Sequence, residues 1–466
     1  MNKIPRLILA LIFISSLSIQ SCHSKNETKN NSLNGKWAIE FISNDIGDVR
    51  SFLTFEFTDT SFIAYTRKGA DRDILGFWKS LLGRIFTKDF KNGSLINITN
   101  GKVIEQKDSL LLSGIFMSAL GNYYFKGSIF GGQLQATLTD GKKNNRGTIQ
   151  GSKTLPRTPL SDYPALVKRS IELTKENIYN PALLEKGEWE KFDRSITTVS
   201  EKIEDDIEME FAFFYFAGKL PVSHYSLVRQ GIKKEEEKHE KASHQIILKE
   251  KTAETLYMKI KSFSGTASEM DSVFSIISAK GYKNLIVDLR DNPGGTVEAG
   301  MEFATHVVDS TFYGGVFLTK KWFEKNKRIP SIGDYANFPH FTEANFDLIL
   351  EGVHNKEGIC LKVIPAKNPY KGKLFILTNG STASTCEPIV YALKQHKKAI
   401  IVGEKTAGAM LNGEFFSITD GFSMIIPTAD YYTSDGFRID TKGVNPTIIT
   451  DQEKALDFVM DHFIKN

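Results

Sequence analysis

Residues 373–393 read KLFILTNGSTASTCEPIVYAL, and this stretch decides the fold of the chain around it. A short apolar run typical of a buried strand leads through small hydroxyl residues into an amphipathic helix with Pro388 in its first turn. Ser384 falls at the junction, beside backbone N–H groups without partners and the positive end of a helix dipole. A hydroxyl in that place suits a catalytic nucleophile with half of an oxyanion hole. A single serine at a helix start is more often an ordinary N-cap, so the rest of the chain has to decide.

The chain around this stretch alternates predicted strands with predicted helices. The strands are expected at 255–260, 285–289, 374–377 and 400–402, and the helices at 270–279, 297–308 and 387–395. This alternation predicts an α/β core over residues 229–466. Residues 313–370 interrupt it with many aromatic residues and little periodicity, and an insertion of that length indicates a lid or a small subdomain.

Two further segments precede the α/β core. Residues 34–155 are rich in β-branched and aromatic residues in short runs separated by Gly, Asn and Asp, which predicts an all-β small barrel or sandwich. Residues 74–90 depart from this pattern with apolar residues at helical spacing, and we expect a helix or lid between strands there. Residues 156–228 predict a helical subdomain with apolar stripes that face a core. The stripe residues are Tyr163, Leu166, Val167, Ile171, Trp189, Phe192, Ile196, Ile207, Met209, Phe211 and Phe214.

The N-terminus has the pattern of a targeting segment. Basic residues precede an apolar run, residues 7–14, that is too short to span a bilayer as a helix. The run leads to a small residue and Cys22, a pattern that resembles a bacterial lipoprotein cleavage site. We therefore expect a lipoprotein signal peptide over 1–22, lipidation of Cys22, a flexible linker over 23–33, and a protein anchored in the bacterial cell envelope that faces the periplasm or the surface. The alternative is plain secretion with Cys22 as a spare cysteine.

Composition narrows the remaining classes of function. The 466 residues carry a net charge of +4 spread over short runs, and the densest charged block, residues 233–241, mixes both signs, so no nucleic-acid partner is expected. Apart from Cys22, only Cys360 and Cys386 occur, too few for a disulfide framework. The sequence has no His/Cys/Glu spacing typical of a metal site and no phosphate-binding glycine loop, so no metal or cofactor is expected. The oligomeric state is left open.

Three segments together carry a family resemblance. The first is NLIVDLRDNPGG, residues 284–295, a predicted strand and a turn whose glycines expose backbone N–H groups. The second is the Ser384 corner, and the third is IIVGEKTAGA, residues 400–409. In this order they resemble the tail-specific or C-terminal processing serine peptidases, a group that includes the tricorn core peptidase and the interphotoreceptor retinoid-binding protein, over about residues 160–450. The resemblance implies a multidomain chain with a twisted crotonase-like (ClpP-like) α/β peptidase core behind the helical subdomain.

The resemblance also implies the nucleophile and the oxyanion donors. Ser384 takes the place of the family's nucleophile. The donors fall on the backbone N–H of Thr385 and of a glycine in the Asn-Pro-Gly-Gly turn, first Gly294, with Gly295 beside it. Sequence and resemblance therefore agree, since both places expose unpaired N–H groups.

The branches of this family use different bases, and this chain departs from the Ser-Lys branch. The Ser-Lys branch carries a lysine directly after Thr-x-Gly, and here that position is Ala409. Lys405, four residues earlier, is interpreted as a solvated or structural lysine. The tricorn-like branch instead uses a histidine from the helical subdomain, and the segment 220–224, LPVSH, is similar to its short turn there. His224 is therefore expected to act as the base, for which a neutral imidazole is suited.

Three further residues are assigned by the same resemblance. Asp440 precedes a Gly-Val-x-Pro motif where tricorn-like members carry an orienting acid, although a turn aspartate that bonds its own backbone is an open alternative. Ser223 is expected to help to position the tetrahedral intermediate. Glu387 is interpreted as a carboxylate of the first helical turn.

These expectations describe an envelope-anchored serine endopeptidase that hydrolyses peptide or protein substrates through an acyl-enzyme at Ser384 with His224 as base. The chain between His224 and the strand at Thr255 is too short for the PDZ module of many relatives. Substrate capture is therefore expected to fall to the β-rich domain, the 313–370 insertion or the open cleft. The alternative is a non-catalytic binding protein for a lipid or apolar ligand on the same fold, since NGKW at 34–37 is similar to the first strand of lipocalin-like domains.

Overall fold

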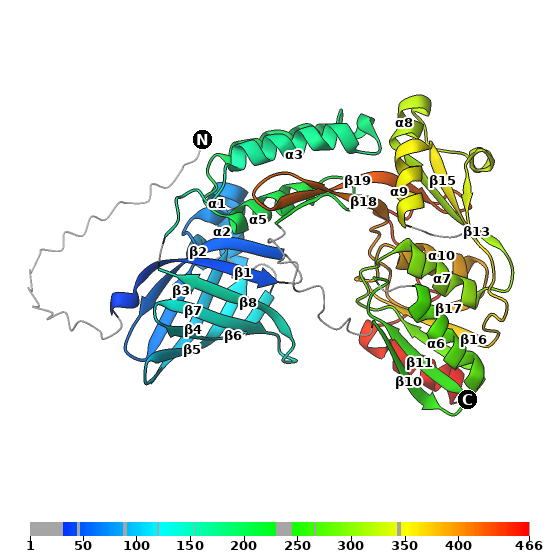
Figure 1. Ribbon diagram of the computed structural model, residues 1–466, viewed down its shortest axis with the longest axis horizontal. Helices are drawn as coiled ribbons and strands as arrows, with labels where there is room; N and C mark the ends of the chain where they lie inside the picture. Colours follow the sequence, from blue (N-terminus) through cyan, green and yellow to red (C-terminus); the bar gives the residue numbers. More distant parts are fainter. Residues whose placement is uncertain are drawn as a thin grey trace, which may run out of the picture.

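The computed structural model describes residues 31–43, 47–86, 91–118, 121–153, 155–229, 245–264, 267–342 and 346–465. The predicted signal peptide with Cys22 lies outside these residues. Figure 1 shows a β-barrel on one side, an α/β part on the other, and helices with long strands that join the two. Among the described residues, no helix combines the length and the apolar character that crossing a membrane requires.

Eight antiparallel strands form a closed barrel, so the predicted small barrel or sandwich is a barrel. Each strand pairs with the next one along the chain, and β1 pairs with both β2 and β8, which closes the sheet on itself. The strands are β1 (Gly35–Ser43), β2 (Gly47–Phe57), β3 (Ser61–Tyr65), β4 (Ile96–Gln106), β5 (Ser109–Ser118), β6 (Gly121–Phe130), β7 (Gln133–Thr139) and β8 (Asn145–Ser152).

Aromatic side chains fill the interior of this barrel. Alternate residues of the strands point inward, and Trp37, Phe55, Phe62 and Phe125 are buried. The rings of Trp37 and Phe55 pack edge to face with centroids 5.7 Å apart. The indole N–H of Trp37 donates to the carbonyl of Leu33 (2.9 Å), so its polar atom is satisfied although the ring is buried. The interior is therefore a packed core.

The predicted helical insertion in the barrel forms two short helices. These are α1 (Ala70–Leu75) and α2 (Phe77–Phe86), between β3 and β4. Several apolar side chains of α2 face outward, and Trp78 is 73% exposed. Lys79 of α2 donates to the hydroxyl of Tyr215 (2.8 Å), so α2 lies next to the helices that follow the barrel.

Three helices follow the barrel, as the apolar stripes predicted. They are α3 (Tyr163–Asn177), α4 (Gly187–Ser200) and α5 (Asp206–Ala217). The stripe prediction is wrong at Phe214, whose side chain is 71% exposed. The buried face of α5 is formed by Met209, Ala212 and Phe213, and the next residue along a helix points about 100° away from that face.

One continuous sheet joins the barrel to the rest of the chain. Strand β9 (Ser226–Arg229) follows α5 and pairs with β19 (Phe422–Tyr432), while Gly47 of β2 pairs with Arg229. Strand β19 pairs further with β18 (Leu411–Ser417) and with β13 (Phe312–Thr319). The turn between α5 and β9 is therefore held from the barrel side and from the α/β side.

A second sheet of six strands forms the centre of the α/β part. Its order is β10-β11-β12-β16-β17-β20, with β10 antiparallel and the other strands parallel. The strands are β10 (Ile246–Thr252), β11 (Thr255–Ile260), β12 (Asn284–Asp288), β16 (Lys373–Thr378), β17 (Ala399–Gly403) and β20 (Ile448–Ile449). The helices are α6 (Ala267–Lys280), α7 (Val297–Val307), α10 (Cys386–Gln395) and α11 (Ala455–Val459). The predicted alternation is confirmed, because each predicted strand and helix has a counterpart in the structure.

Residues 313–370 form an ordered subdomain around a gap at 343–345 that the structure does not describe. Strand β13 pairs with β19 and with β15, so this segment extends the sheet that begins in the barrel. Its elements are β13 (Phe312–Thr319), α8 (Lys320–Asn326), η5 (Ile332–Asn337), β14 (His340–Phe341), α9 (Phe346–Asn355) and β15 (Gly358–Val363). The remaining short helices are η1 (Asn31–Leu33), η2 (Lys91–Gly93), η3 (Pro181–Leu183), η6 (Gln452–Lys454) and η7 (Met460–Ile464).

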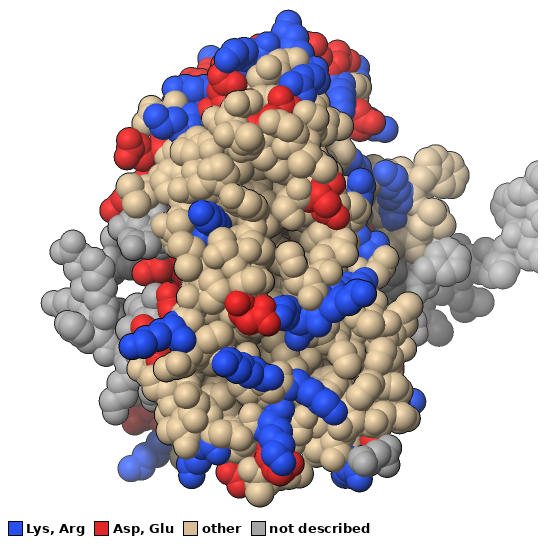
Figure 2. Space-filling model, turned by 90° about the vertical axis from the view of Figure 1, so that its right-hand side faces the viewer, with Lys and Arg blue, Asp and Glu red and all other residues tan. Residues whose placement is uncertain are grey.

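Figure 2 shows the face that the α/β part turns away from the barrel. Basic and acidic side chains are interspersed on it, and most of its middle is uncharged.

Candidate active site

The Ser384 corner lies between β16 and α10, where the sequence predicted it. Strand β16 ends at Thr378, helix α10 begins at Cys386, and the hydroxyl of Thr382 donates to the carbonyl of Leu289 (2.8 Å), which ties the corner to the end of β12. Ser384 has a φ of 54°. A left-handed backbone is uncommon for a residue with a Cβ, and such residues cluster at active sites.

Two glycines bring the Asn-Pro-Gly-Gly turn against this corner. A Cβ on Gly294 would lie 2.6 Å from the Cβ and 3.1 Å from the Oγ of Ser384. A Cβ on Gly295 would lie 2.2 Å from the carbonyl carbon of Phe263. Only glycine permits such approaches, so the turn passes directly beside the Ser384 hydroxyl.

The backbone N–H groups around Ser384 differ in whether they have a partner. Within the described residues, the N–H groups of Thr385 and Gly295 have no acceptor, and the Thr385 hydroxyl donates to the Gly295 carbonyl (2.8 Å). The N–H of Gly294 donates to Oδ1 of Asn292 (2.9 Å). The expectation that Gly294 or Gly295 is the glycine donor stays a prediction, and the hydrogen bonds favour Gly295. The Asn292 side chain occupies the N–H of Gly294, and Gly295 is the glycine whose N–H has no partner.

His224 lies in the turn between α5 and β9, next to Ser223. The imidazole Nδ1 is 2.8 Å from Oγ of Ser223, and the Ser223 hydroxyl donates to Oδ1 of Asp440 (2.5 Å). Because the Ser223 proton goes to the carboxylate, the Ser223 oxygen accepts the Nδ1–H of His224. The Nε2 of a neutral His224 then carries the lone pair, as a general base requires.

The protonation of His224 depends on its surroundings. Burial lowers the pKa of His224 below its ordinary value, and the Asp440 carboxylate opposes part of that shift. The neutral, base-competent imidazole is therefore favoured at neutral pH.

Asp440 is fully buried and holds several groups in place. Its carboxylate accepts the Ser223 hydroxyl, the backbone N–H of Met410 (3.1 Å) and a guanidinium N–H of Arg438 (3.1 Å). The expected orienting acid thus contacts the histidine through Ser223. Ser223 lies between His224 and Asp440, and its expected contact with the reaction intermediate stays a prediction.

The third segment joins the Ser384 corner to Asp440. The N–H of Ser384 donates to the carbonyl of Ala409 (3.1 Å), and the next residue, Met410, donates to Asp440. Among the described residues no hydrogen bond joins His224 directly to Ser384. Catalytic hydrogen bonds are often long in proteins without substrate and shorten in the complex.

Glu387 organises the same region from the first turn of α10. Its buried carboxylate accepts the N–H groups of Gly408 (2.7 Å), Ala409 (2.8 Å) and Ser384 (3.2 Å) and the hydroxyl of Thr406 (2.6 Å). Burial raises the pKa of Glu387, and these donors oppose the shift. The carboxylate is in the first turn as predicted. Its role as the anchor of the third segment was missed, because the sequence alone does not place residues 404–409 beside it.

A lysine base beside Ser384 would have to come from position 405 or position 409. Lys405 is exposed, which confirms its interpretation as a solvated lysine. The side chain at 409 is a methyl group. Neither position therefore places an amine beside Ser384.

A small apolar recess of about 40 Å³ opens next to the corner. Thr385 and Met410 line the side that is close to Ser384. The opposite walls come from α7, β13, β15 and α10, and include Val297, Met301, Phe312, Phe317, Leu361 and Ile389. A recess of this kind suits an apolar side chain.

Part of the chain is similar to known peptidases. The model of peptidase family S41 matches residues 254–450. A carboxyl-terminal-processing protease of a Picosynechococcus species is 26% identical over 209 residues, which are 44% of this chain and 42% of that protein. The chloroplastic C-terminal processing peptidase of Tetradesmus obliquus is 27% identical over 198 residues, 42% of this chain and 35% of its own. The chain thus spans less than half the length of these relatives.

Solved structures match a larger share of the chain, at lower sequence identity. The match to the photosystem II D1 C-terminal processing protease covers 63% of this chain and 94% of that chain, at 15% identity and a TM-score of 0.37. The match to the tricorn protease covers 88% of this chain and 46% of that chain, at 11% identity and a TM-score of 0.43. The segment 254–450 contains the Ser384 corner and Asp440, whereas His224 precedes it.

Proposed function

We propose, on the premise that residues 254–450 form a peptidase family S41 domain, that this chain is a serine endopeptidase that works through an acyl-enzyme at Ser384. The observation that carries the proposal is the hydrogen-bonded series from Asp440 through Ser223 to His224. It fixes the imidazole tautomer that a general base needs, and burial keeps that imidazole neutral.

The proposed reaction has two halves, formation of the acyl-enzyme and its hydrolysis, and the same residues act in both. His224 Nε2 takes the proton of the Ser384 hydroxyl while Oγ attacks the peptide carbonyl. The N–H groups of Gly295 and Thr385 receive the developing oxyanion. His224 then gives its proton to the leaving amine, and water hydrolyses the acyl-enzyme by the reverse proton path.

The substrate proposal rests on the recess beside Ser384. Its lining is apolar and one wall contains Thr385, so a substrate side chain next to the scissile bond would enter it. We therefore propose peptide or protein substrates with an apolar residue at the cleavage site. The barrel interior is filled by its own aromatic side chains, which favours the peptidase over the alternative of a carrier with a lipid in the barrel.

The location and the finer architecture belong to the same proposal. The sequence pattern before Cys22 supports anchoring in the bacterial envelope through a lipidated cysteine. The parallel strands β11, β12, β16 and β17 with their covering helices support a crotonase-like core, and the order of elements supports domains at 34–155, 156–228 and 229–466.

Replacement of the nucleophile tests the proposal. Ser384→Ala is expected to abolish hydrolysis of an apolar-rich peptide library and labelling by a fluorophosphonate, while circular dichroism stays unchanged. Ser381→Ala is the matched control, because Ser381 is exposed on the same corner and should keep both activities. Undiminished cleavage or labelling in Ser384→Ala would refute the proposal.

A further inference from the structure

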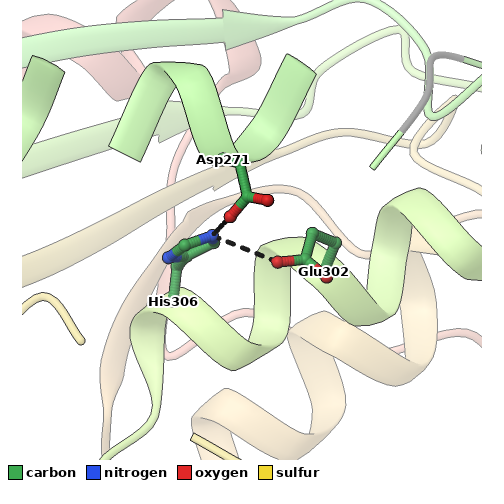
Figure 3. Close-up of side chains that lie close together, drawn as sticks. All are labelled: Asp271, Glu302 and His306. Atoms are coloured by element: carbon green, nitrogen blue, oxygen red, sulfur yellow. Dashed lines mark hydrogen bonds and ion pairs between the residues drawn. The ribbon is translucent and has the colours of Figure 1, made fainter. Parts of the chain in front are cut away.

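Three metal-ligating side chains meet on helices α6 and α7, outside the site described above (Figure 3). Asp271 comes from α6, and Glu302 and His306 lie one turn apart on α7. Nε2 of His306 is 3.0 Å from Oδ1 of Asp271 and 3.2 Å from Oε1 of Glu302. All three ligand atoms lie within 4.8 Å of one another. The cluster thus brings one nitrogen and two carboxylate oxygens together.

These separations match those of ligands around a small metal ion. Zinc binds histidine nitrogen and carboxylate oxygen at about 2.0–2.2 Å. Two such ligands at tetrahedral or octahedral angles are about 3.0–3.4 Å apart. Both distances from His306 fall in this range, so an ion could enter with small shifts of the exposed Asp271 side chain.

The imidazole is held in position by packing. The ring of Phe274 stacks on the His306 ring with centroids 4.5 Å apart and an angle of 8° between planes. The carbonyl of His306 accepts the N–H of Tyr370 (2.7 Å), which fixes the end of α7. Only 12% of the His306 side chain is exposed. A ligand that is already oriented loses little freedom when it binds an ion.

The charge of the cluster also favours a cation. Two carboxylates lie within 3.2 Å of the same nitrogen, and Glu302 is partly buried there. A divalent ion would neutralise both carboxylates. A nitrogen ligand selects zinc-like ions over Ca²⁺ and Mg²⁺, which prefer oxygen.

We propose that Asp271, Glu302 and His306 bind one divalent transition-metal ion of the zinc type, which fastens α6 to α7. The site lies on the helix that starts directly after the Gly295 turn and packs against Thr385 through Gly300. The ion would therefore stabilise the α6–α7 pair, and α7 is the helix that contacts Thr385.

Metal titration of the full chain tests the proposal. Chelator-treated protein is titrated with Zn²⁺ by calorimetry and with Co²⁺ by visible absorption, and melting is followed with and without Zn²⁺. The wild type is expected to bind one ion at this site and to melt at a higher temperature with Zn²⁺. Asp271→Asn and His306→Gln should bind at least about tenfold more weakly and lose the shift in melting temperature.

A second histidine provides the control. His354 pairs with Glu414 (2.9 Å) and half of its side chain is exposed, so His354→Gln should bind Zn²⁺ like the wild type. Asp271 is exposed, and Asp271→Asn therefore keeps the test valid if His306→Gln does not fold. A wild type without Zn²⁺ binding, or binding that Asp271→Asn leaves unchanged, would overturn the proposal.

Discussion

Ser384 and His224 both hold a left-handed backbone, with φ angles of 54° and 53°. For residues with a Cβ this conformation costs about 1–3 kcal/mol and persists only where the surroundings hold it. At Ser384 the holding contacts are the N–H bonds to Ala409 and Glu387, and at His224 they include the bond to Ser223. The strain therefore falls on the two residues to which the proposed chemistry assigns the proton transfer.

The acid limb of the pH profile is a prediction at this scale. The base works when neutral, so kcat/KM falls as the pH falls through the pKa of His224. Because burial lowers this pKa, we expect the midpoint below about 6.5, the value of an ordinary imidazole. The measurement is kcat/KM on a short peptide from pH 4 to 9.

Lys405→Ala is the control for that profile. Lys405 is exposed, so its removal should leave rate and midpoint unchanged. A midpoint well above 6.5 in the wild type, or a large loss of rate in Lys405→Ala, would contradict the assignment of His224 as the base.

On the scale of elements, the loops that follow three strands meet at the site. The turn after β12 supplies Gly295, the corner after β16 supplies Ser384, and residues 404–409 after β17 supply the carbonyl that binds the Ser384 N–H. All three strands are parallel neighbours, so their carboxyl ends lie at one edge of the sheet. Sites at this edge are typical of open α/β sheets, for the same geometrical reason.

Gly294→Ala tests how closely the turn after β12 packs against the corner after β16. The new Cβ would lie 2.6 Å from that of Ser384, so the two loops must move apart. We expect a folded protein whose kcat/KM is lower by about 10²-fold, since shifts near 1 Å cost that much. Steady-state kinetics and circular dichroism measure both quantities.

Gly380→Ala is the matched control on the same corner. A Cβ there would meet no heavy atom within 4 Å, and φ is not positive. Its activity should equal that of the wild type. Equal losses in the two variants would show that the corner responds to any added methyl group and not to the contact with Ser384.

On the scale of the whole molecule, the barrel supports the helix that leads to His224. Three acidic side chains at the start of helix α5 contact residues of the barrel domain. The contacts are Ser51 to Asp205 (2.6 Å), Arg50 to Asp206 (2.8 Å) and Arg67 to Glu208 (2.7 Å). The turn with Ser223 and His224 follows α5 directly. The barrel therefore fixes the base without contributing any group to the proposed chemistry.

Arg50→Ala tests the strength of this support. The side chain of Asp206 is fully buried, and loss of its main cation leaves a charge that Arg229 (3.3 Å), Tyr163 (2.8 Å) and the backbone N–H of residue 50 (3.0 Å) still contact. Breaking a buried pair costs about 3–5 kcal/mol, and the remaining partners place the expected loss near 3 kcal/mol. Urea unfolding measures it.

Arg169→Ala is the comparison for that variant. Arg169 pairs with Glu172 on an exposed face of α3, where a pair is worth less than about 1 kcal/mol. Similar losses in the two variants would contradict a special role of the interface. Arg50→Ala should also slow fluorophosphonate labelling of Ser384, because α5 carries the base.

The sequence by itself determined the features that depend on neighbouring residues. Strand β11 begins and ends where the pattern predicted, and the other predicted elements of the α/β core differ at their ends by a few residues. The Ser384 corner, the exposed Lys405 and the helical insertion in the barrel were equally predictable. Each follows from periodicity, turn residues or helix-start signals within a few positions.

Only the tertiary structure decided how distant segments share their hydrogen bonds. Ser223 and Asp440 are 217 residues apart, and no local pattern says that the serine lies between the acid and His224. The occupied N–H of Gly294 depends on the Asn292 rotamer, and the exposure of Phe214 depends on which face of α5 its neighbours cover. Likewise, β1 closes the barrel because β8 reaches it across the whole domain. Such contacts result from the packing of complete elements, and short-range preferences of the chain do not encode them.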